Sequence, residues 1–240
     1  MRLDDFIVRD NEEYPMLTEG INDRGIFKAV MMAGIAGSGK SFVATKVKSG
    51  NIEPRIVNTD TWIEHYGNSY DKWVDTSVQL TKSQLTLYLN SMLPLLCDTT
   101  STSFNTVLRR LQLLERFGYD VAMVYVHTSL ETALARIARR ERKVPEWQVI
   151  EYFEKAKKIK PYLKNKFQLF LEVKNDDGEL TDEVIQKVFK RTLSFYESDI
   201  QNPLGVEAVK MMQENGWKYL SPNIYELSDI KEMAGRWYSK

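Results

Sequence analysis

The sequence predicts an α/β domain of three layers, in which a parallel sheet is covered by helices on both faces. Two observations predict this fold class. Nearly continuous apolar runs of strand length recur along the chain, and longer stretches of helical character separate them. Parallel strands that are buried on both faces appear in a sequence as such apolar runs, and the connections between them are usually helical. Right-handed crossovers then arrange the elements as a doubly wound domain.

The predicted strands are short and apolar, and several of the predicted helices have recognisable limits. Thr128 and Glu131 have the spacing of a capping box directly after the fourth strand. A later helix is predicted over Leu180 to Ser194, with Thr181 as its N-cap. The five predicted strands are Phe27–Ala33, Arg55–Val57, Leu95–Cys97, Val121–Val126 and Phe167–Val173.

The chain divides into three parts by composition. Residues 1–25 are polar and irregular, and we expect a lead-in there. Residues 26–200 hold the alternating pattern and form the predicted main domain. After the turn-like segment Asn202–Gly205 the strand pattern stops, so residues 201–240 are predicted to be a small helical extension.

Charge and cysteine content exclude several classes of protein. Lys plus Arg and Asp plus Glu both number 33 in the 240 residues, so the formal net charge is zero. This balance excludes a uniformly basic coat for nucleic acid, although it allows a local basic patch. Cys97 is the one cysteine, which excludes an intrachain disulfide and a cysteine-based zinc site.

The strongest local signal is the segment Gly34–Ser41, which matches the phosphate-binding pattern G-x-x-x-x-G-K-[ST]. A predicted strand precedes it and a predicted helix, Phe42 to Lys48, follows it. Glycines let backbone amides wrap a phosphate, and the helix N-terminus adds its dipole. The alternative is a glycine turn that precedes a lysine by chance. The predicted nucleotide-contacting residues are Gly34, Ala36, Gly37, Ser38, Gly39, Lys40, Ser41 and Phe42.

The loop also predicts the cofactors. Lys40 would neutralise β- and γ-phosphate oxygens, and the Ser41 hydroxyl would ligate magnesium. We therefore expect ATP and Mg²⁺. The loop alone does not distinguish a kinase from an ATPase or a GTPase, but it predicts a three-layer P-loop NTPase domain.

Two carboxylates follow predicted strands at the sheet edge where ligands collect in open α/β folds. Asp60 comes just after the second strand, where a carboxylate can take the proton of an acceptor hydroxyl. Its alternative role is a helix N-cap. Asp98 follows the third strand and is predicted to hold magnesium together with Ser41, with a strand-end turn as the alternative.

Two basic segments complete the candidate site. Arg136 and Arg140 share one helix face before Lys143-Val144-Pro145, and we predict that they stabilise transferring phosphoryl charge from a lid over about residues 136–146. The alternative is a solvated basic helix end. The run Lys157–Lys166 either follows a phosphate backbone or forms a solvated face.

The ordered set of motifs resembles the P-loop kinases related to bacteriophage polynucleotide kinase and the zeta toxins. The set consists of the glycine loop, Asn58-Thr59-Asp60, Asp98-Thr99-Thr100, and the two arginines before Val144-Pro145. The likeness covers about residues 27–155. By this resemblance Asp60 is the general base, Lys40 and Ser41 serve nucleotide and magnesium, Arg136 and Arg140 are lid arginines, and Asp98 is the strand-end carboxylate.

The chain departs from the polynucleotide kinases beside the predicted base. Thr59 and Ile63 stand where those enzymes carry arginines. The expected activity is ATP-dependent transfer of the γ-phosphate to a hydroxyl, in a polynucleotide (a 5′-hydroxyl end or a hydroxymethylated pyrimidine) or in a nucleotide. The alternatives are a zeta-like kinase of an amino-sugar nucleotide, and a non-kinase NTPase or nucleotide-sensing module.

The expected location follows from the absence of two signals. The sequence contains no stretch of about 20 apolar residues that would span a bilayer. The start of the chain lacks the pattern of a secretory signal. We expect no membrane partner and a cytoplasmic location, in the host cytoplasm if a phage encodes the chain.

Overall fold

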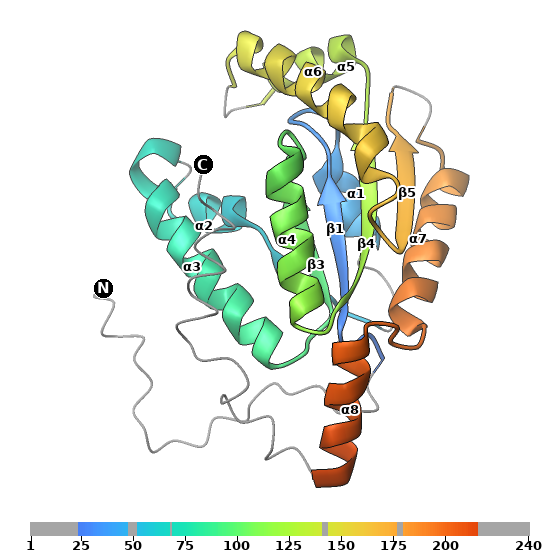
Figure 1. Cartoon of the computed structure of the whole chain (residues 1–240). Helices are drawn as coiled ribbons and strands as arrows, with labels where there is room; N and C mark the ends of the chain where they lie inside the picture. Colours follow the sequence, from blue (N-terminus) through green and yellow to red (C-terminus); the bar gives the residue numbers. More distant parts are fainter. Residues whose placement is uncertain (1–23, 48–51, 68, 141–143, 177–179, 216–240) are drawn as a thin grey trace.

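The centre of the fold is a five-stranded parallel sheet with the order β2-β3-β1-β4-β5 (Figure 1). The structure is a computed structural model that describes residues 24–47, 52–67, 69–140, 144–176 and 180–215. All four strand pairings are parallel. The three-layer α/β fold class is therefore confirmed. The strands are β1 (Lys28–Ala33), β2 (Arg55–Val57), β3 (Leu95–Thr99), β4 (Asp120–His127) and β5 (Leu169–Lys174).

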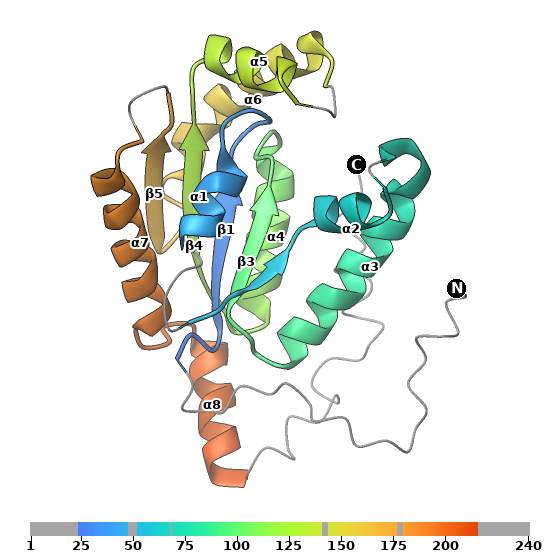
Figure 2. The same ribbon diagram turned by 180° about the vertical axis from the view of Figure 1, so that it is seen from behind.

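Helices cover both faces of the sheet and also its carboxyl end. α1 and α7 lie on one face and α3 and α4 on the other, while α5 and α6 lie across the end at which the strands finish (Figures 1 and 2). The helices are α1 (Lys40–Val47), α2 (Thr59–His65), α3 (Tyr70–Asn90), α4 (Phe104–Arg116), α5 (Leu130–Ala138), α6 (Glu146–Leu163), α7 (Asp182–Glu197) and α8 (Pro203–Asn215).

The side chains of the central strand, β1, alternate between two separate hydrophobic cores. Ala29 and Met31 belong to the cluster that includes residues of α3 and α4. Val30 and Met32 belong to the cluster that includes residues of α1 and α7. Every residue of β1 is buried. Successive strand residues point to opposite faces, so a strand covered on both faces is apolar except where a buried polar side chain has a partner. This is why the predicted apolar runs became strands.

The helix caps agree with the sequence in one case and correct it in another. Thr181 caps α7, and its hydroxyl accepts a hydrogen bond from the backbone N–H of Val184. The capping box predicted at Thr128 is wrong, because Ser129 caps α5. The Thr128 hydroxyl instead donates to the carboxylate of Asp176, which lies after β5 and is a charged, strong acceptor.

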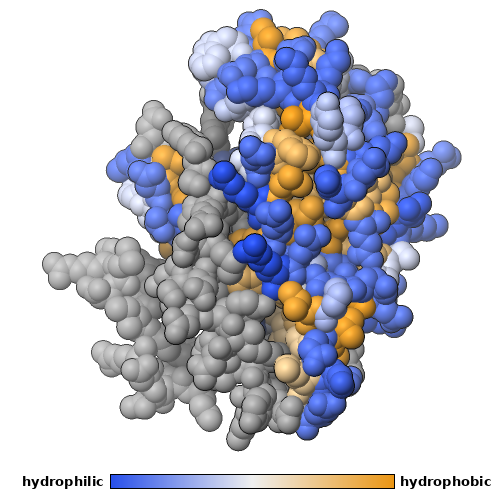
Figure 3. Space-filling view, in the orientation of Figure 1, coloured by the Kyte–Doolittle hydropathy of each residue, from blue (hydrophilic) through white to orange (hydrophobic). Residues whose placement is uncertain are grey.

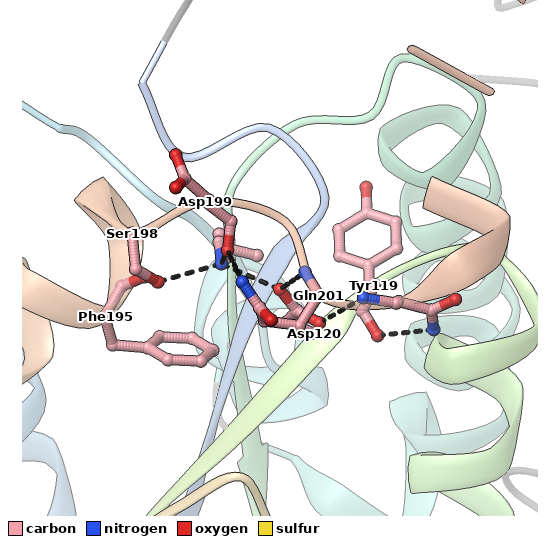
Figure 4. Close-up of polar contacts among 8 residues, drawn as sticks. Tyr119, Asp120, Phe195, Ser198, Asp199 and Gln201 are labelled. Carbon is pink, nitrogen blue, oxygen red and sulfur yellow. Dashed lines mark hydrogen bonds and ion pairs between the residues drawn. The ribbon is translucent and has the colours of Figure 1, made fainter. Parts of the chain in front are cut away.

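A buried polar cluster closes the amino end of the sheet (Figure 4). The Nζ of Lys28 lies 2.7 Å from Oδ2 of Asp120, at the paired starts of β1 and β4. Lys28 also donates to the carbonyl of Asp199 at 2.8 Å. The Asp120 carboxylate accepts hydrogen bonds from the backbone N–H groups of Gln201 and Asn202, both at 2.8 Å. The cluster thereby fixes the connection between α7 and α8 to the sheet.

α8 is the described part of the predicted C-terminal extension. Met212 is buried in the core that contains α3 and α4. Gly205 and Gly118 lie so close that a Cβ on Gly205 would be 2.3 Å from the Gly118 carbonyl oxygen. Of the predicted extension, residues 216–240 lie outside the described residues, as do residues 1–23 of the lead-in, and the three-part division stays a prediction. No described helix has both the length and the apolar character of a membrane span.

Candidate active site

The glycine-rich loop joins β1 to α1, and its backbone requires glycine at several positions. The φ angles of Gly37 and Gly39 are +82° and +85°, in the left-handed region that favours glycine. A Cβ on Gly37 would lie 2.6 Å from the carbonyl oxygen of Ala133, and one on Gly39 would lie 2.1 Å from the Nδ2 of Asn175. The loop is therefore a narrow cradle of bare backbone, as phosphate binding requires.

The end of β5 holds this loop in place. Asn175 is 7% exposed, and its Nδ2 donates to the carbonyl of Ser38 at 2.7 Å. The carbonyl of Asn175 in turn accepts a hydrogen bond from Nη1 of Arg136 at 2.8 Å. Sequence reasoning missed Asn175, because it lies 137 residues from Ser38 and belongs to no local motif.

Lys40 and Asp98 form an ion pair beside the loop. Lys40 Nζ lies 2.9 Å from Oδ1 of Asp98 and donates to the Thr99 carbonyl at 3.1 Å. The pairing of β3 with β1 places the end of β3 directly beside the loop. Lys40 and Asp98 line a cavity of about 140 Å³ together with Ser41 and Asn58. The structure therefore brings together both predicted magnesium residues.

Asp60 lies in the first turn of α2, the helix that follows β2. Asn58 caps this helix, and its side-chain oxygen accepts the backbone N–H of Asp60 at 2.9 Å. The alternative role of Asp60 as the N-cap is therefore wrong, because Asn58 occupies that position. Asp60 and Asp98 both line a cavity of about 510 Å³. This volume lies in the range of small-molecule sites.

The polar groups fit a nucleotide with magnesium. The hydroxyl of Ser38, inside the loop, is buried and makes no hydrogen bond with the described residues. No cluster of three or more His, Cys, Asp or Glu side chains in the described residues could hold a metal unaided. Mg²⁺ in nucleotide sites needs only one or two protein ligands, because substrate phosphates supply others. Ser41 and Asp98 suit that requirement.

Comparison with protein families decides the classification. A family model described as an AAA domain matches residues 30–158, which is more than half of the chain. The chain belongs to this AAA domain family. The match runs from β1 into α6 and includes the loop, Asp60, Asp98 and both predicted lid arginines. No curated protein matches the chain.

Solved structures of modest similarity accompany the family match. A putative kinase from Chloroflexus aurantiacus is 14% identical and has a TM-score of 0.48, with 68% of this chain and 97% of that chain covered. A structure of the PezAT toxin–antitoxin system of Streptococcus pneumoniae is 16% identical, with a TM-score of 0.49 and coverage of 80% and 87%. Shikimate kinase from Acinetobacter baumannii is 18% identical, with a TM-score of 0.44 and coverage of 69% and 93%.

The two predicted lid arginines of the AAA domain lie in different surroundings. Arg136, in the last turn of α5, is partly buried and its Nη1 lies 3.4 Å from the Gly37 carbonyl oxygen. Arg140 follows α5 with an exposed side chain. Arg136 thus contacts the loop backbone, whereas the catalytic roles of both arginines stay predictions. Residues 141–143 of the predicted lid lie outside the described residues.

The remaining predicted site residues of the AAA domain have exposed or partly exposed side chains. Phe42 is 50% exposed on α1, with Lys46 Nζ 5.6 Å from the centre of its ring. In the lysine run, the side chains of Lys157, Lys158 and Lys164 are exposed. The surface over α6 carries hydrophilic side chains with scattered apolar ones (Figure 3).

A charged network follows β4 and β5 beside the loop. Oε1 of Glu172 lies 2.9 Å from Nε2 of His127 and accepts a hydrogen bond from Lys160 at 2.6 Å. The hydrogen bond from Lys160 lowers the pKa of Glu172. Burial, followed by the positive charge of Lys160, lowers the pKa of His127, although Glu172 opposes this change. The network therefore favours a neutral imidazole and a charged carboxylate at pH 7.

Proposed function

We propose that this AAA domain is a magnesium-dependent phosphotransferase that moves the γ-phosphoryl group of ATP to a hydroxyl acceptor. The observation that carries the proposal is the shared position of Asp98. This residue pairs with the loop lysine and also lines the 510 Å³ cavity together with Asp60. A phosphate site that shares a residue with a cavity lined by a further carboxylate suits transfer to a bound acceptor.

In the proposed reaction each residue has a definite task. Asp60 accepts the proton of the acceptor hydroxyl as its oxygen bonds to the γ-phosphorus, and the bond from that phosphorus to the β–γ bridging oxygen breaks to leave ADP. Lys40 would turn from Asp98 to the phosphate oxygens, and Ser41 and Asp98 would hold magnesium. The ion would neutralise the charge on the β- and γ-phosphate oxygens.

The experiment measures transfer of label from γ-³²P-labelled ATP to a panel of acceptors. The panel contains 5′-hydroxyl DNA and RNA, DNA with hydroxymethylated pyrimidines, nucleosides, and an amino-sugar nucleotide. Lys40→Ala is expected to abolish transfer. Asp60→Asn is expected to keep ATP binding and to lower turnover by roughly 10²–10⁴-fold, as loss of a general base does.

Glu64→Gln is the matched control, because Glu64 is an exposed acid one turn further along α2. It makes the same chemical change on the same helix and is expected to leave turnover unchanged. Release of free phosphate with no labelled acceptor would favour a plain NTPase. Full activity of Asp60→Asn would exclude Asp60 as the base.

A further inference from the structure

Ser101 is a buried residue of the 510 Å³ cavity whose hydroxyl has no partner among the described residues. The residue is 1% exposed, lines the cavity, and its Oγ makes no hydrogen bond with the described residues. A buried hydroxyl without a partner costs stability, by roughly 1–3 kcal/mol. Ser101 also has a φ of +54°, which is unfavourable for a residue with a Cβ. Its retention in this conformation calls for a role that the fold alone does not supply.

Arg110 brings a second donor to the same cavity. It extends from α4, and its Nη1 donates to the carbonyl of Asp98 at 3.0 Å. That bond fixes the guanidinium beside the end of β3. Arg110 and Ser101 both line the cavity, so one bound molecule can reach an O–H and an N–H donor.

The charges of the cavity disfavour an anionic acceptor. The described lining residues include three carboxylates, Asp60, Asp75 and Asp98, against one guanidinium, that of Arg110. A phosphate placed here would meet like charges in partly excluded solvent, where repulsion is poorly screened. Nucleotide phosphates on the glycine-rich loop would add further negative charge. The charges of the lining therefore exclude an anionic group from the cavity.

The apolar part of the lining narrows the choice further. Four valines and the ring of a tyrosine line the cavity beside the polar groups. A sugar has hydroxyls around most of its ring and little continuous apolar surface, so it would leave these apolar side chains largely without apolar contact. A nucleoside has apolar ring faces and polar edges and suits both kinds of lining. The apolar residues are Val57, Val74, Val78, Val107 and Tyr152.

We propose that the cavity selects an uncharged nucleoside as the phosphate acceptor, and that Ser101 and Arg110 select it by donating hydrogen bonds to its oxygen or ring-nitrogen atoms. The role of the nucleoside as a substrate rests on the proposed phosphotransfer. Its binding to the cavity does not depend on that reaction. The selectivity has two parts. The Ser101 hydroxyl raises the affinity for the nucleoside, and the carboxylates of the cavity lower the affinity for an acceptor that carries a phosphate.

The test is titration calorimetry of the full chain with uridine, thymidine, cytidine and adenosine, with the 5′-monophosphate of each, and with UDP-N-acetylglucosamine. At least one nucleoside is expected to bind, with its monophosphate at least tenfold weaker. Ser101→Ala is expected to weaken nucleoside binding about three- to tenfold, as expected for one lost hydrogen bond, and to leave ATP affinity unchanged.

Ser101→Gly separates recognition from folding. Glycine accepts a φ of +54°, so this variant is expected to keep or raise the urea midpoint while it loses nucleoside affinity. Ser77→Ala is the matched control, because Ser77 is also a buried serine whose hydroxyl has no hydrogen-bond partner, and it is not among the residues that line the cavity. It is expected to leave nucleoside affinity unchanged.

Four outcomes would overturn the inference: no nucleoside binds, the monophosphates bind as tightly, only the sugar nucleotide binds, or both Ser101 variants bind like the wild type. Failure of the phosphotransferase proposal has a different signature. In that case the nucleoside binds with the expected dependence on Ser101, but no label passes from ATP to it.

Discussion

Two lysine–aspartate pairs lie at opposite ends of the same sheet, with similar distances and different surroundings. At the amino end, Lys28 and Asp120 are 2.7 Å apart with side chains 1% and 5% exposed. At the carboxyl end, Lys40 and Asp98 are 2.9 Å apart with side chains 12% and 26% exposed. The first carboxylate also accepts two backbone N–H groups, whereas the second lines two cavities.

The difference shows how one kind of contact serves two purposes. A buried pair whose remaining hydrogen-bonding groups are satisfied by the chain cannot exchange partners without a large cost. A partly exposed pair beside a cavity can exchange, because water or a ligand can replace either partner at small cost. Lys28–Asp120 therefore holds the fold, and Lys40–Asp98 is suited to release its lysine to a phosphate.

The largest expected effect tests this contrast directly. Asp120→Ala leaves the Lys28 ammonium buried and two backbone N–H groups without an acceptor, so the free energy of unfolding should fall by about 3–5 kcal/mol. Asp98→Ala should lower it by about 1 kcal/mol or less. Urea titration of both variants measures the two losses. Equal losses would contradict the division of roles.

The sequence predicted the features that contiguous residues determine. The glycine-rich loop was found because its backbone geometry needs glycines at fixed spacing, and the strands were found because β1 is buried on both faces. The placement of Asp60 and Asp98 near one another was predicted because the ends of parallel strands share one edge. In each case the physical cause lies within a few residues of the signal.

Other features depend on residues far apart in the chain, and the sequence did not indicate them. Lys28 was read as part of an apolar strand, since its partner Asp120 lies 92 residues away. Thr128 was assigned to a cap because Asp176, 48 residues later, gave no local sign of its role. Ser101 belongs to no sequence motif, and only its position in the cavity indicates a role for it. A lysine inside an apolar strand was the one signal that could have prompted a search for a buried carboxylate.

A smaller effect is expected at Asn175, which supports the loop from β5. Asn175→Ala removes the hydrogen bond to the Ser38 carbonyl, so ATP affinity should fall about three- to tenfold. Asn175→Asp should be worse, because a carboxylate would face both a carbonyl oxygen and the phosphates. Calorimetric titration with ATP measures both changes.

Asn202 supplies the matched control at the other end of the sheet. Its Nδ2 donates to the carbonyls of Glu115 and Tyr119 at 2.8 and 3.1 Å. Asn202→Ala should lower the urea midpoint and leave ATP affinity unchanged. If both asparagine variants lost ATP affinity equally, the two ends of the sheet would not be functionally distinct.

The smallest expected effect concerns pH and the start of α5. The backbone N–H of Ser129 and then the hydroxyl of Thr128 donate to Asp176 and lower its pKa from 3.8 to about 2. A lowered carboxyl pKa stabilises the fold above the unfolded value, and this contribution disappears as pH falls through the folded value. The advantage of the wild type over Asp176→Ala, on the order of 1 kcal/mol, should therefore be constant above about pH 5 and shrink between about pH 4 and 2.

Urea titrations across this pH range measure that advantage, and Thr128→Val, which removes one of the donors to Asp176, should reduce its pH dependence only in part. A difference that stayed constant down to pH 2 would mean that the Asp176 charge does not hold α5. The contacts that Asn175 and Arg136 make with the loop would then not depend on the Asp176 charge. Arg136 contacts the loop from α5, so a change in the position of α5 would also change that contact. If Asp176→Ala had no pH effect and left ATP affinity unchanged, we would assign the positioning of the loop to the Asn175 contact.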